Sequence, residues 1–202
     1  MGCDGAQETM TRVAETSVTT DPEARLRDFE RLVVAEGASL LRLARRLLGD
    51  PDEADDLLQD ALVNAYRALS SFRGESSMKT WVWRIVTREG LKKLRRRKLK
   101  NKVAGWFRGS EAPPPGLGLG RARLPESLAD TQQQMLVLQK AMEKLPDRQR
   151  ATLVMRYFEG MPVAEIAEVL EIGPGTVKTH LVRALKQVRA AWPKDMKWEG
   201  EP

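Results

Sequence analysis

Cysteine, histidine and aromatic residues are scarce in this sequence of 202 residues. It contains one cysteine, Cys3, and one histidine, His180, and aromatic residues make up 5%. A single cysteine excludes an intrachain disulfide and a cysteine-based metal centre, and His180 has no second histidine to join as a metal ligand. We therefore expect no metal and no other cofactor, and the cysteine content suits a reducing compartment.

Long apolar runs are also missing. No stretch approaches the roughly 18 apolar residues that a membrane-spanning helix needs. The first twenty residues, MGCDGAQETMTRVAETSVTT, lack the apolar core of a secretory signal. We therefore predict a cytoplasmic protein without a membrane span.

Alternating strand-type runs are absent as well, while Leu, Ala, Glu, Arg and Lys dominate. We predict an all-α protein, and the length allows two small domains, each with its own core. The net charge of +6 and a pI near 9.6 favour a polyanionic partner.

Composition divides the chain into five segments. We expect a mobile tail (1–24), a first helical domain (25–99), a Pro/Gly-rich linker (100–130), a second helical domain (131–192) and a C-terminal tail (193–202). The linker sequence GSEAPPPGLGLGRARLP makes a compact fold improbable there.

Apolar residues at helical spacing predict three helices in the first domain. The first begins near Leu26, is interrupted near Gly37 and stops at Gly49-Asp50-Pro51. The second begins at Asp52 or Glu53, and the third runs from about residue 79 to residue 98. The second helix carries a regular apolar stripe: Ala54, Leu57, Leu58, Ala61, Leu62, Ala65, Tyr66 and Leu69.

Four helices are predicted in the second domain. The first ends at Leu145-Pro146, the next is capped by Asp147, and two more span about 162–170 and 174–191. The segment EIAEVLEIGPGTVKTHLVRA holds the last pair. A phosphate-binding loop would need Gly directly before Lys, yet Val177 precedes Lys178, so we reject that interpretation.

A helix-turn-helix accounts for more of this segment. Ile172 would hold the turn, Gly173 would tolerate a left-handed backbone, and Pro174 sits where a helix can begin. No acidic residue occurs from Pro174 to Lys194, which suits phosphate contact. The residues predicted to face DNA are Pro174, Gly175, Thr176, Lys178, Thr179, His180 and Arg183.

The first domain is acidic at one end and basic at the other. Residues 50–62 carry six acids and no Lys or Arg, whereas residues 84–102 carry ten basic residues and only the acid Glu89. The basic end suits nucleic acid, and the acidic helix should bind protein. Trp81 and Trp83, beside the basic end, could stack on unpaired bases. The alternative is that they are core residues, and we expect at least one of them to lie in the core.

Several ordered motifs together resemble a known family. The strings DEADDLLQDALVNAYRAL, FRGESSMKTWVWRIVTREGLKKLRRRK and LPDRQRATLVMRYFEGMPVAEIAEVLEIGPGTVKTHLVRALKQVR resemble regions 2 and 4 of extracytoplasmic-function (ECF) sigma factors of bacterial RNA polymerase. The resemblance covers about residues 26–192. A single helix-turn-helix would not be this specific.

The resemblance implies partners and site residues. Asp55, Asp56, Gln59 and Asp60 would dock on the clamp helices of the largest subunit of core RNA polymerase. The loop and third helix would capture and line the melted -10 strand of promoter DNA, and the helix from Pro174 would read the -35 element. The predicted -10 residues are Arg73, Gly74, Ser76, Met78, Lys79, Trp81, Arg84, Arg88, Lys92 and Arg95.

Three further expectations follow from the resemblance. The linker would thread through the polymerase towards the RNA exit path, and a separate anti-sigma factor would control the protein. Many family members have Asn where this chain has Arg88, and an arginine cannot offer the same amide pair to a base edge.

Two other functional classes compete with this interpretation. An autonomous helix-turn-helix repressor or activator would dimerise on palindromic duplex DNA without polymerase. An enzyme such as a nuclease lacks an acid or metal cluster in the sequence, and no nucleophile-base-orienter set stands out. We predict a protein without catalytic activity.

Overall fold

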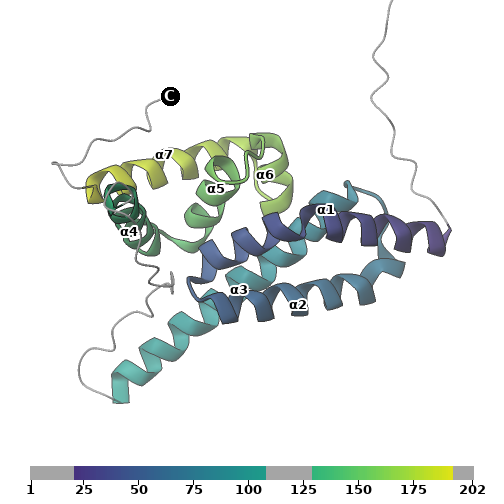
Figure 1. Cartoon of the computed structure of the whole chain (residues 1–202), viewed down its shortest axis with the longest axis horizontal. Helices are drawn as coiled ribbons and strands as arrows, with labels where there is room; N and C mark the ends of the chain where they lie inside the picture. Colours follow the sequence, from purple (N-terminus) through teal and green to yellow (C-terminus); the bar gives the residue numbers. More distant parts are fainter. Residues whose placement is uncertain (1–20, 108–128, 193–202) are drawn as a thin grey trace, which may run out of the picture.

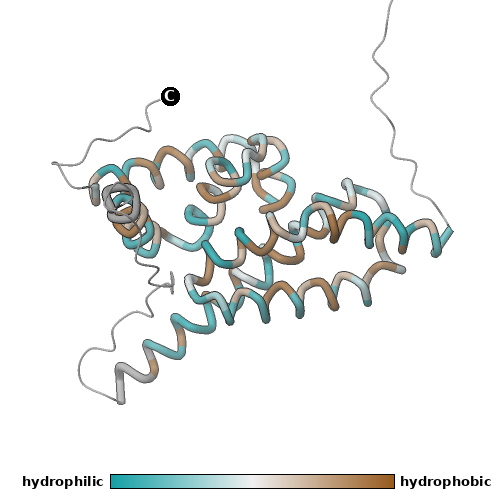
Figure 2. The backbone as a smooth tube through the Cα atoms, in the orientation of Figure 1, coloured by the Kyte–Doolittle hydropathy of each residue, from teal (hydrophilic) through white to brown (hydrophobic). Residues whose placement is uncertain are grey.

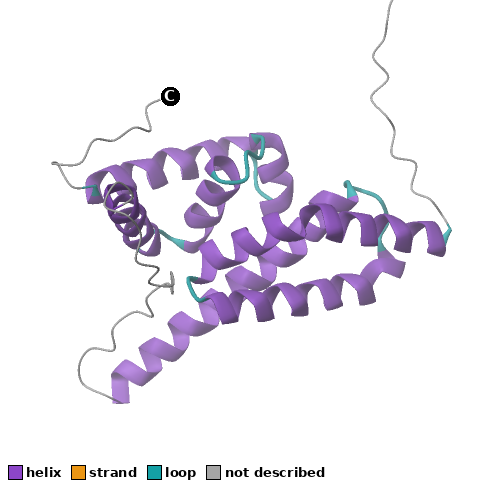
Figure 3. Cartoon of the chain, viewed as in Figure 1, coloured by secondary structure: helices purple, strands orange, loops and turns teal. Residues whose placement is uncertain are grey.

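The computed structural model describes residues 21–107 and 129–192, and within them every regular element is a helix (Figures 1 and 3). The predicted all-α class is therefore confirmed for this part of the chain. Residues 1–20, 108–128 and 193–202, which hold most of the predicted tails and linker, lie outside it. No helix in the described ranges is long and apolar enough to cross a membrane.

Helix α1 spans Pro22–Leu48 without a break at Gly37, so the predicted interruption is wrong. Asp21 caps it: the carboxylate accepts hydrogen bonds from the backbone N–H groups of Glu23 (3.0 Å) and Ala24 (3.2 Å). The helix ends at Gly49, whose φ of 82° is the left-handed conformation that glycine adopts readily. A Cβ added at Gly37 would meet nothing within 4 Å, so that glycine breaks no packing.

Helix α2 spans Pro51–Ala68, the 3-10 turn η1 spans Leu69–Ser71, and α3 spans Met78–Phe107. Asp50 caps α2, accepting from the N–H of Glu53 at 3.0 Å, so α2 begins just before the predicted position. Helix α3 continues past residue 98 into the segment predicted as linker. Figure 2 shows the part of α3 that leads into this extension as largely hydrophilic, and Figure 1 shows the extension projecting beyond α1 and α2.

Helices α1, α2 and α3 pack on one another as a first unit. Their largest fully buried side chains are Leu40, Leu43, Leu47, Val82, Trp83, Val86 and Leu94. The helices approach closely at Gly90, where an added Cβ would lie 3.2 Å from Leu57 and 3.3 Å from Leu47. Truncation of a buried leucine such as Leu47 to alanine costs about 2–5 kcal/mol in proteins of this kind.

The second unit contains α4 (Ala129–Glu143), α5 (Asp147–Tyr157), α6 (Val163–Leu170) and α7 (Pro174–Ala191). The predicted spans of the last two helices are confirmed. Asp147 is the first residue of α5 and makes no capping hydrogen bond, so its predicted capping role is wrong. Leu145, Val154, Met155, Ile166 and Val177 are the largest fully buried side chains of this unit.

The two units also pack against each other, through α3 on α6 and α1 on α5 (Figure 1). Arg150 lies at this boundary and is only 4% exposed. Its guanidinium donates to three backbone carbonyls, those of Met142 (2.9 Å), Glu143 (2.7 Å) and, across the boundary, Leu47 (2.8 Å). Burial lowers the pKa of Arg150 from its usual value, and these three acceptors hold the buried cation in place.

Candidate nucleic-acid and polymerase interfaces

The outer face of α7 presents most of the residues predicted to contact the -35 element. Val177, Leu181 and Ala184 are buried, and this register turns the residues between them to solvent. The exposed residues on this face are Pro174, Gly175, Thr176, Lys178, Thr179 and Arg183. Helical periodicity therefore predicted correctly that these residues face solvent.

The turn between α6 and α7 differs from the prediction. Gly173 has φ −66° and ψ 149°, which any residue can adopt, so the predicted left-handed glycine is wrong. The left-handed residue is Glu171, with φ 54° and ψ 47°. A side chain in this conformation costs roughly 1–2 kcal/mol, because its Cβ approaches the following carbonyl.

The first turn of α7 suits an anion. It has no acidic residue, and Gly173, at the N-cap, supplies no side-chain cap. The carbonyl of Gly173 accepts from the N–H groups of Thr176 (2.9 Å) and Val177 (3.1 Å). The positive end of the helix dipole thus meets solvent beside Lys178, an arrangement that favours a phosphate group.

His180 is less exposed than its neighbours on α7. Its Nδ1 is buried and makes no hydrogen bond within the described residues. Burial, then the charges of Arg148 and Arg183, lower the pKa of His180 below its usual value. His180 is therefore neutral at pH 7, so it can offer a base one donor or one acceptor but adds no positive charge.

Val182 is an exposed residue that sequence reasoning missed on this surface. It is 66% exposed and lies one turn after Lys178 and Thr179. An apolar side chain in this position can contact a thymine methyl group in the major groove. Its signal in the sequence was the helical register, which places position 182 beside the polar positions 178 and 179.

The acidic face of α2 is exposed, as predicted. Asp56, Gln59 and Asp60 project to solvent, while Asp55 pairs with Arg45 of α1 at 3.1 Å. Tyr66, predicted in the buried stripe, is 57% exposed, with its ring 6.5 Å from that of Phe29. Val63 is exposed as well, so the face combines acids with apolar side chains.

The loop before α3 carries the predicted base-capture residues. Gly74 has φ 72°, and Arg73 lies 4.0 Å from Glu75 on the exposed surface. Ser77 closes the loop: its hydroxyl accepts from the N–H of Thr80 at 3.0 Å. Gly74 and Ser76 are half-buried, and Met78 is partly buried against the core.

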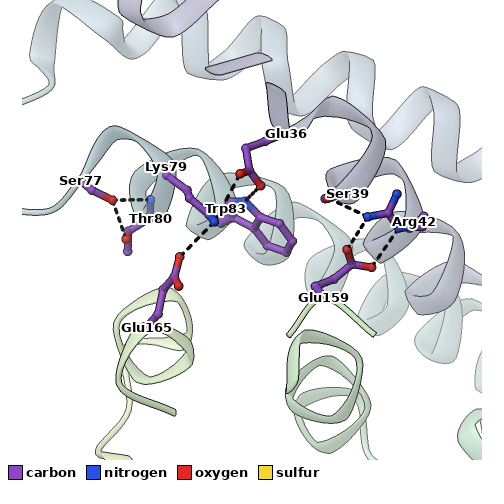
Figure 4. A network of polar contacts seen from close by, with 9 residues as sticks. All are labelled: Glu36, Ser39, Arg42, Ser77, Lys79, Thr80, Trp83, Glu159 and Glu165. Carbon is purple, nitrogen blue, oxygen red and sulfur yellow. Dashed lines mark hydrogen bonds and ion pairs between the residues drawn. The ribbon is translucent and has the colours of Figure 1, made fainter. Parts of the chain in front are cut away.

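The two tryptophans have different environments. Trp83 is 1% exposed, and its indole N–H donates to Glu36 at 3.2 Å, so it belongs to the core (Figure 4). Trp81 is half-buried, with its ring 5.2 Å from that of Phe72 in the loop. Of these two tryptophans, Trp81 is the one that is partly accessible, next to the predicted capture loop.

The basic face of α3 meets the second unit. A cleft of about 520 Å³ is lined by Arg84, Arg88, Lys92 and Arg95 of α3, and by Asp147, Arg148 and Glu171 opposite. Arg84 donates to the carbonyl of Glu168 from Nε (3.2 Å) and Nη2 (3.0 Å). Arg88 and Arg95 are exposed. Part of the predicted -10 surface is thus covered.

Residues 21–107 and 129–192 contain no group of three or more His, Cys, Asp or Glu side chains that could hold a metal ion. The chemistry that these surfaces offer is charge, hydrogen bonding and stacking. Two family models match them: Sigma-70 region 2 matches residues 32–100, and Sigma-70 region 4 matches residues 135–188.

Curated relatives extend the match over most of the chain. The RNA polymerase sigma-H factor of Pseudomonas aeruginosa is 33% identical over 172 residues, covering 82% of this chain and 86% of that protein. The ECF RNA polymerase sigma factor SigW of Bacillus subtilis is 30% identical, covering 74% and 81%. The chain belongs to the ECF sigma factors. Its function is that of a DNA-binding sigma factor in transcription initiation.

Solved structures share the fold of this sigma factor. One is sigma factor RpoE of Bartonella quintana in complex with the anti-sigma factor NepR, with a TM-score of 0.61, 24% identity, and coverage of 84% of this chain and 99% of that one. CnrH in complex with the cytosolic domain of CnrY has a TM-score of 0.59, 22% identity, and coverage of 85% and 91%.

Proposed function

We propose that this sigma factor binds core RNA polymerase through α2, reads the -35 element with α7, and reads and helps to melt the -10 element with the loop and start of α3. The observation that carries the proposal is the separation of charge. The exposed face of α2 is acidic, whereas the exposed faces of α3 and α7 are basic, which suits the first to a protein partner and the others to nucleic acid.

On α2, Asp56, Gln59 and Asp60 dock on the clamp helices of the largest polymerase subunit. Val63 and Tyr66, exposed on the same helix, supply apolar contact area beside these polar groups. Asp55 contributes less, because Arg45 already holds its carboxylate.

On α3, the capture loop takes a flipped base of the -10 strand and Trp81 stacks on a neighbouring base. Arg88, Lys92 and Arg95 follow at helical spacing and hold successive phosphates of the single strand. Arg88 holds a phosphate but cannot offer a base edge the amide pair that Asn offers, so the -10 preference at that position differs from that of relatives with Asn.

The protein acts by binding alone, in the cytoplasm, without a cofactor. The predicted linker (100–130) threads through the polymerase towards the RNA exit path. An anti-sigma factor holds the free protein inactive. A cleft of about 310 Å³ between α1, α4 and α5 suits an amphipathic helix of that regulator, since Met135, Leu138 and Met142 line it beside arginines.

The test is transcription in vitro from a promoter library with purified core polymerase and the full chain. We expect transcripts from a subset of promoters that share two sequence blocks at a fixed spacing. Tight binding of the free protein to a palindromic duplex, with no transcript above that of core polymerase alone, would contradict the proposal and favour an autonomous repressor.

A further inference from the structure

The cleft between α3 and α5 gathers more positive charge than the proposed function uses. Its volume of about 520 Å³ lies within the range of about 300–1,000 Å³ that small-molecule sites occupy. The cations that line it come from both sides. Arg148 belongs to α5, and the others belong to α3: Arg84, Arg88, Lys92 and Arg95. An anion in this cleft therefore meets positive charge from two elements at once.

Two acids line the cleft as well, but each already has a cationic partner. Asp147 pairs with Lys98 at 2.6 Å, and Glu171 pairs with Arg84 at 3.6 Å. Three arginines of the lining form no ion pair within residues 21–107 and 129–192: Arg88, Arg95 and Arg148. The cleft thus retains positive charge that a bound anion would neutralise.

A buried hydroxyl without a partner lines the same cleft. Thr87 is 1% exposed, and its Oγ1 makes no hydrogen bond in the part of the chain that the structure describes. Buried polar groups are rarely left unpaired in folded proteins, because an unmade hydrogen bond is destabilising. An oxygen of a ligand in the cleft would accept a hydrogen bond from this hydroxyl.

The start of α5 adds backbone donors. Pro146 occupies the N-cap position, and no side chain caps the helix. The N–H of Arg150 donates to the carbonyl of Pro146 at 2.9 Å, so the N–H groups of residues 147–149 precede the hydrogen bonds of the helix. Pro146, Asp147 and Arg148 line the cleft. A helix N-terminus in this position favours a phosphate group, through its N–H groups and its dipole.

We propose that this cleft binds a small ligand with a polyphosphate chain, which Arg148 and the start of α5 hold on one side and Arg88 and Arg95 hold on the other. Guanidinium groups suit phosphates, because each can donate two parallel hydrogen bonds. A chain of phosphates engages cations of both sides, whereas a single phosphate engages fewer. The chain is either free or part of a nucleotide, for whose base Leu91 offers apolar contact area in the lining.

The experiment is isothermal titration calorimetry of the full chain with inorganic tripolyphosphate, without divalent cations and at an ionic strength of about 0.15 M. We expect saturable binding at one site and much weaker binding of AMP. Absence of saturable binding up to about 1 mM tripolyphosphate would overturn the proposal. ATP is titrated in parallel. Tighter binding of ATP assigns a nucleoside polyphosphate, and equal or weaker binding assigns the free chain.

Two variants test the groups of the cleft. R148Q removes an exposed charge, and T87V removes the unpaired hydroxyl, so both should fold, which circular dichroism checks. R148Q should weaken tripolyphosphate binding roughly tenfold, because a charge-assisted contact is lost, and T87V should weaken it less. The matched control R67Q removes an exposed arginine of α2 that forms no ion pair within the described ranges, and it should bind normally. Unchanged affinity in R148Q, or an equal loss in R67Q, would refute the site.

His180 gives a second readout, as the only histidine of the chain. Arg148 is one of the charges that lower its pKa. Bound polyphosphate offsets that charge, so the pKa of His180, measured by NMR, should rise when tripolyphosphate is present. An unchanged pKa at saturating tripolyphosphate would contradict binding beside Arg148.

Nucleic acid is the competing occupant, since α3 also carries the proposed -10 surface. A short single-stranded oligonucleotide is therefore titrated into the same variants. We expect R148Q to keep its affinity for the oligonucleotide, because Arg148 lies on α5, outside that surface. Equal losses of oligonucleotide and tripolyphosphate affinity in R148Q would overturn the small-ligand proposal and make the cleft a nucleic-acid site.

Discussion

The two proposed DNA-reading surfaces are presented differently. On α7, the first turns lie open to solvent and contain no acidic residue. On α3, Lys79 and Arg84 are engaged by acids and a carbonyl of the other unit. On our proposal, a duplex element reaches the first surface as it stands, whereas a single strand competes with the second unit for Lys79 and Arg84. On this account, use of both surfaces at once requires the two units to rearrange.

The largest expected effect concerns the surface that recruits polymerase and so makes that rearrangement possible. We predict that Asp56→Arg with Asp60→Arg abolishes binding to core polymerase, because both acids are exposed and reversal places like charges at the interface. Co-purification with tagged core measures it. The control, Glu23→Arg with Glu30→Arg, makes the same charge change on α1 and should bind normally. Wild-type yield of the α2 variant would refute the docking assignment.

A second prediction separates melting from recruitment. Deletion of Gly74, Glu75 and Ser76 leaves Ser77 to cap α3, so binding to core polymerase should persist. Promoter opening should fail, because the base-capture loop is gone. Permanganate footprinting reports opening as reactive thymines around the start site. Unchanged reactivity in the variant would show that the loop does not act on the extruded base.

A third, smaller effect distinguishes contacts to bases from contacts to phosphates on α7. Lys178→Ala and Arg183→Ala should each weaken -35 binding by roughly 1–3 kcal/mol if the contact is bidentate to a base. A phosphate contact would instead weaken matched and scrambled elements alike and reduce the salt slope by about one unit. Titrations of the polymerase complex at several salt concentrations separate the two. Gln187→Ala, exposed near the far end of α7, should change neither quantity.

The smallest expected effect is a pH dependence at His180. Its pKa is lowered in the folded state, so the unfolded chain takes up a proton first as the pH falls below about 6.5. The contribution of neutral His180 to the free energy of unfolding is fully present above that pH. It declines as the pH falls from there to the pKa of His180 in the folded state. Denaturation between pH 7.5 and 5.5 should show a slightly flatter profile for His180→Gln. Identical profiles would contradict this assignment.

Sequence periodicity predicted the faces of single helices well. The register of Val177 and Leu181 located the outer face of α7, and the spans of α6 and α7 agree with the structure. The errors lie where local chemistry has more than one solution. Gly37 lies inside a continuous helix that tertiary packing stabilises. In the turn before α7, the left-handed residue is Glu171, two positions before Gly173.

Contacts between units could not be predicted this way. The sequence shows that Arg84 and Glu171 are charged and outward, but nothing in a helical period says that they lie 3.6 Å apart. Asp147 illustrates the same limit, since a residue suited to capping α5 instead pairs with Lys98 of α3. Tertiary placement therefore decides which cations of the basic face are available to DNA.

The most direct test of the central claim is binding to one promoter fragment that carries both sequence blocks from the library. The free chain, core polymerase and their mixture are each titrated in the presence of heparin, with permanganate added to detect melting. The account predicts a heparin-resistant, open complex at this fragment only for the mixture, because polymerase must hold both surfaces over their elements. A specific complex formed by the free chain alone, at the same concentrations, would contradict it.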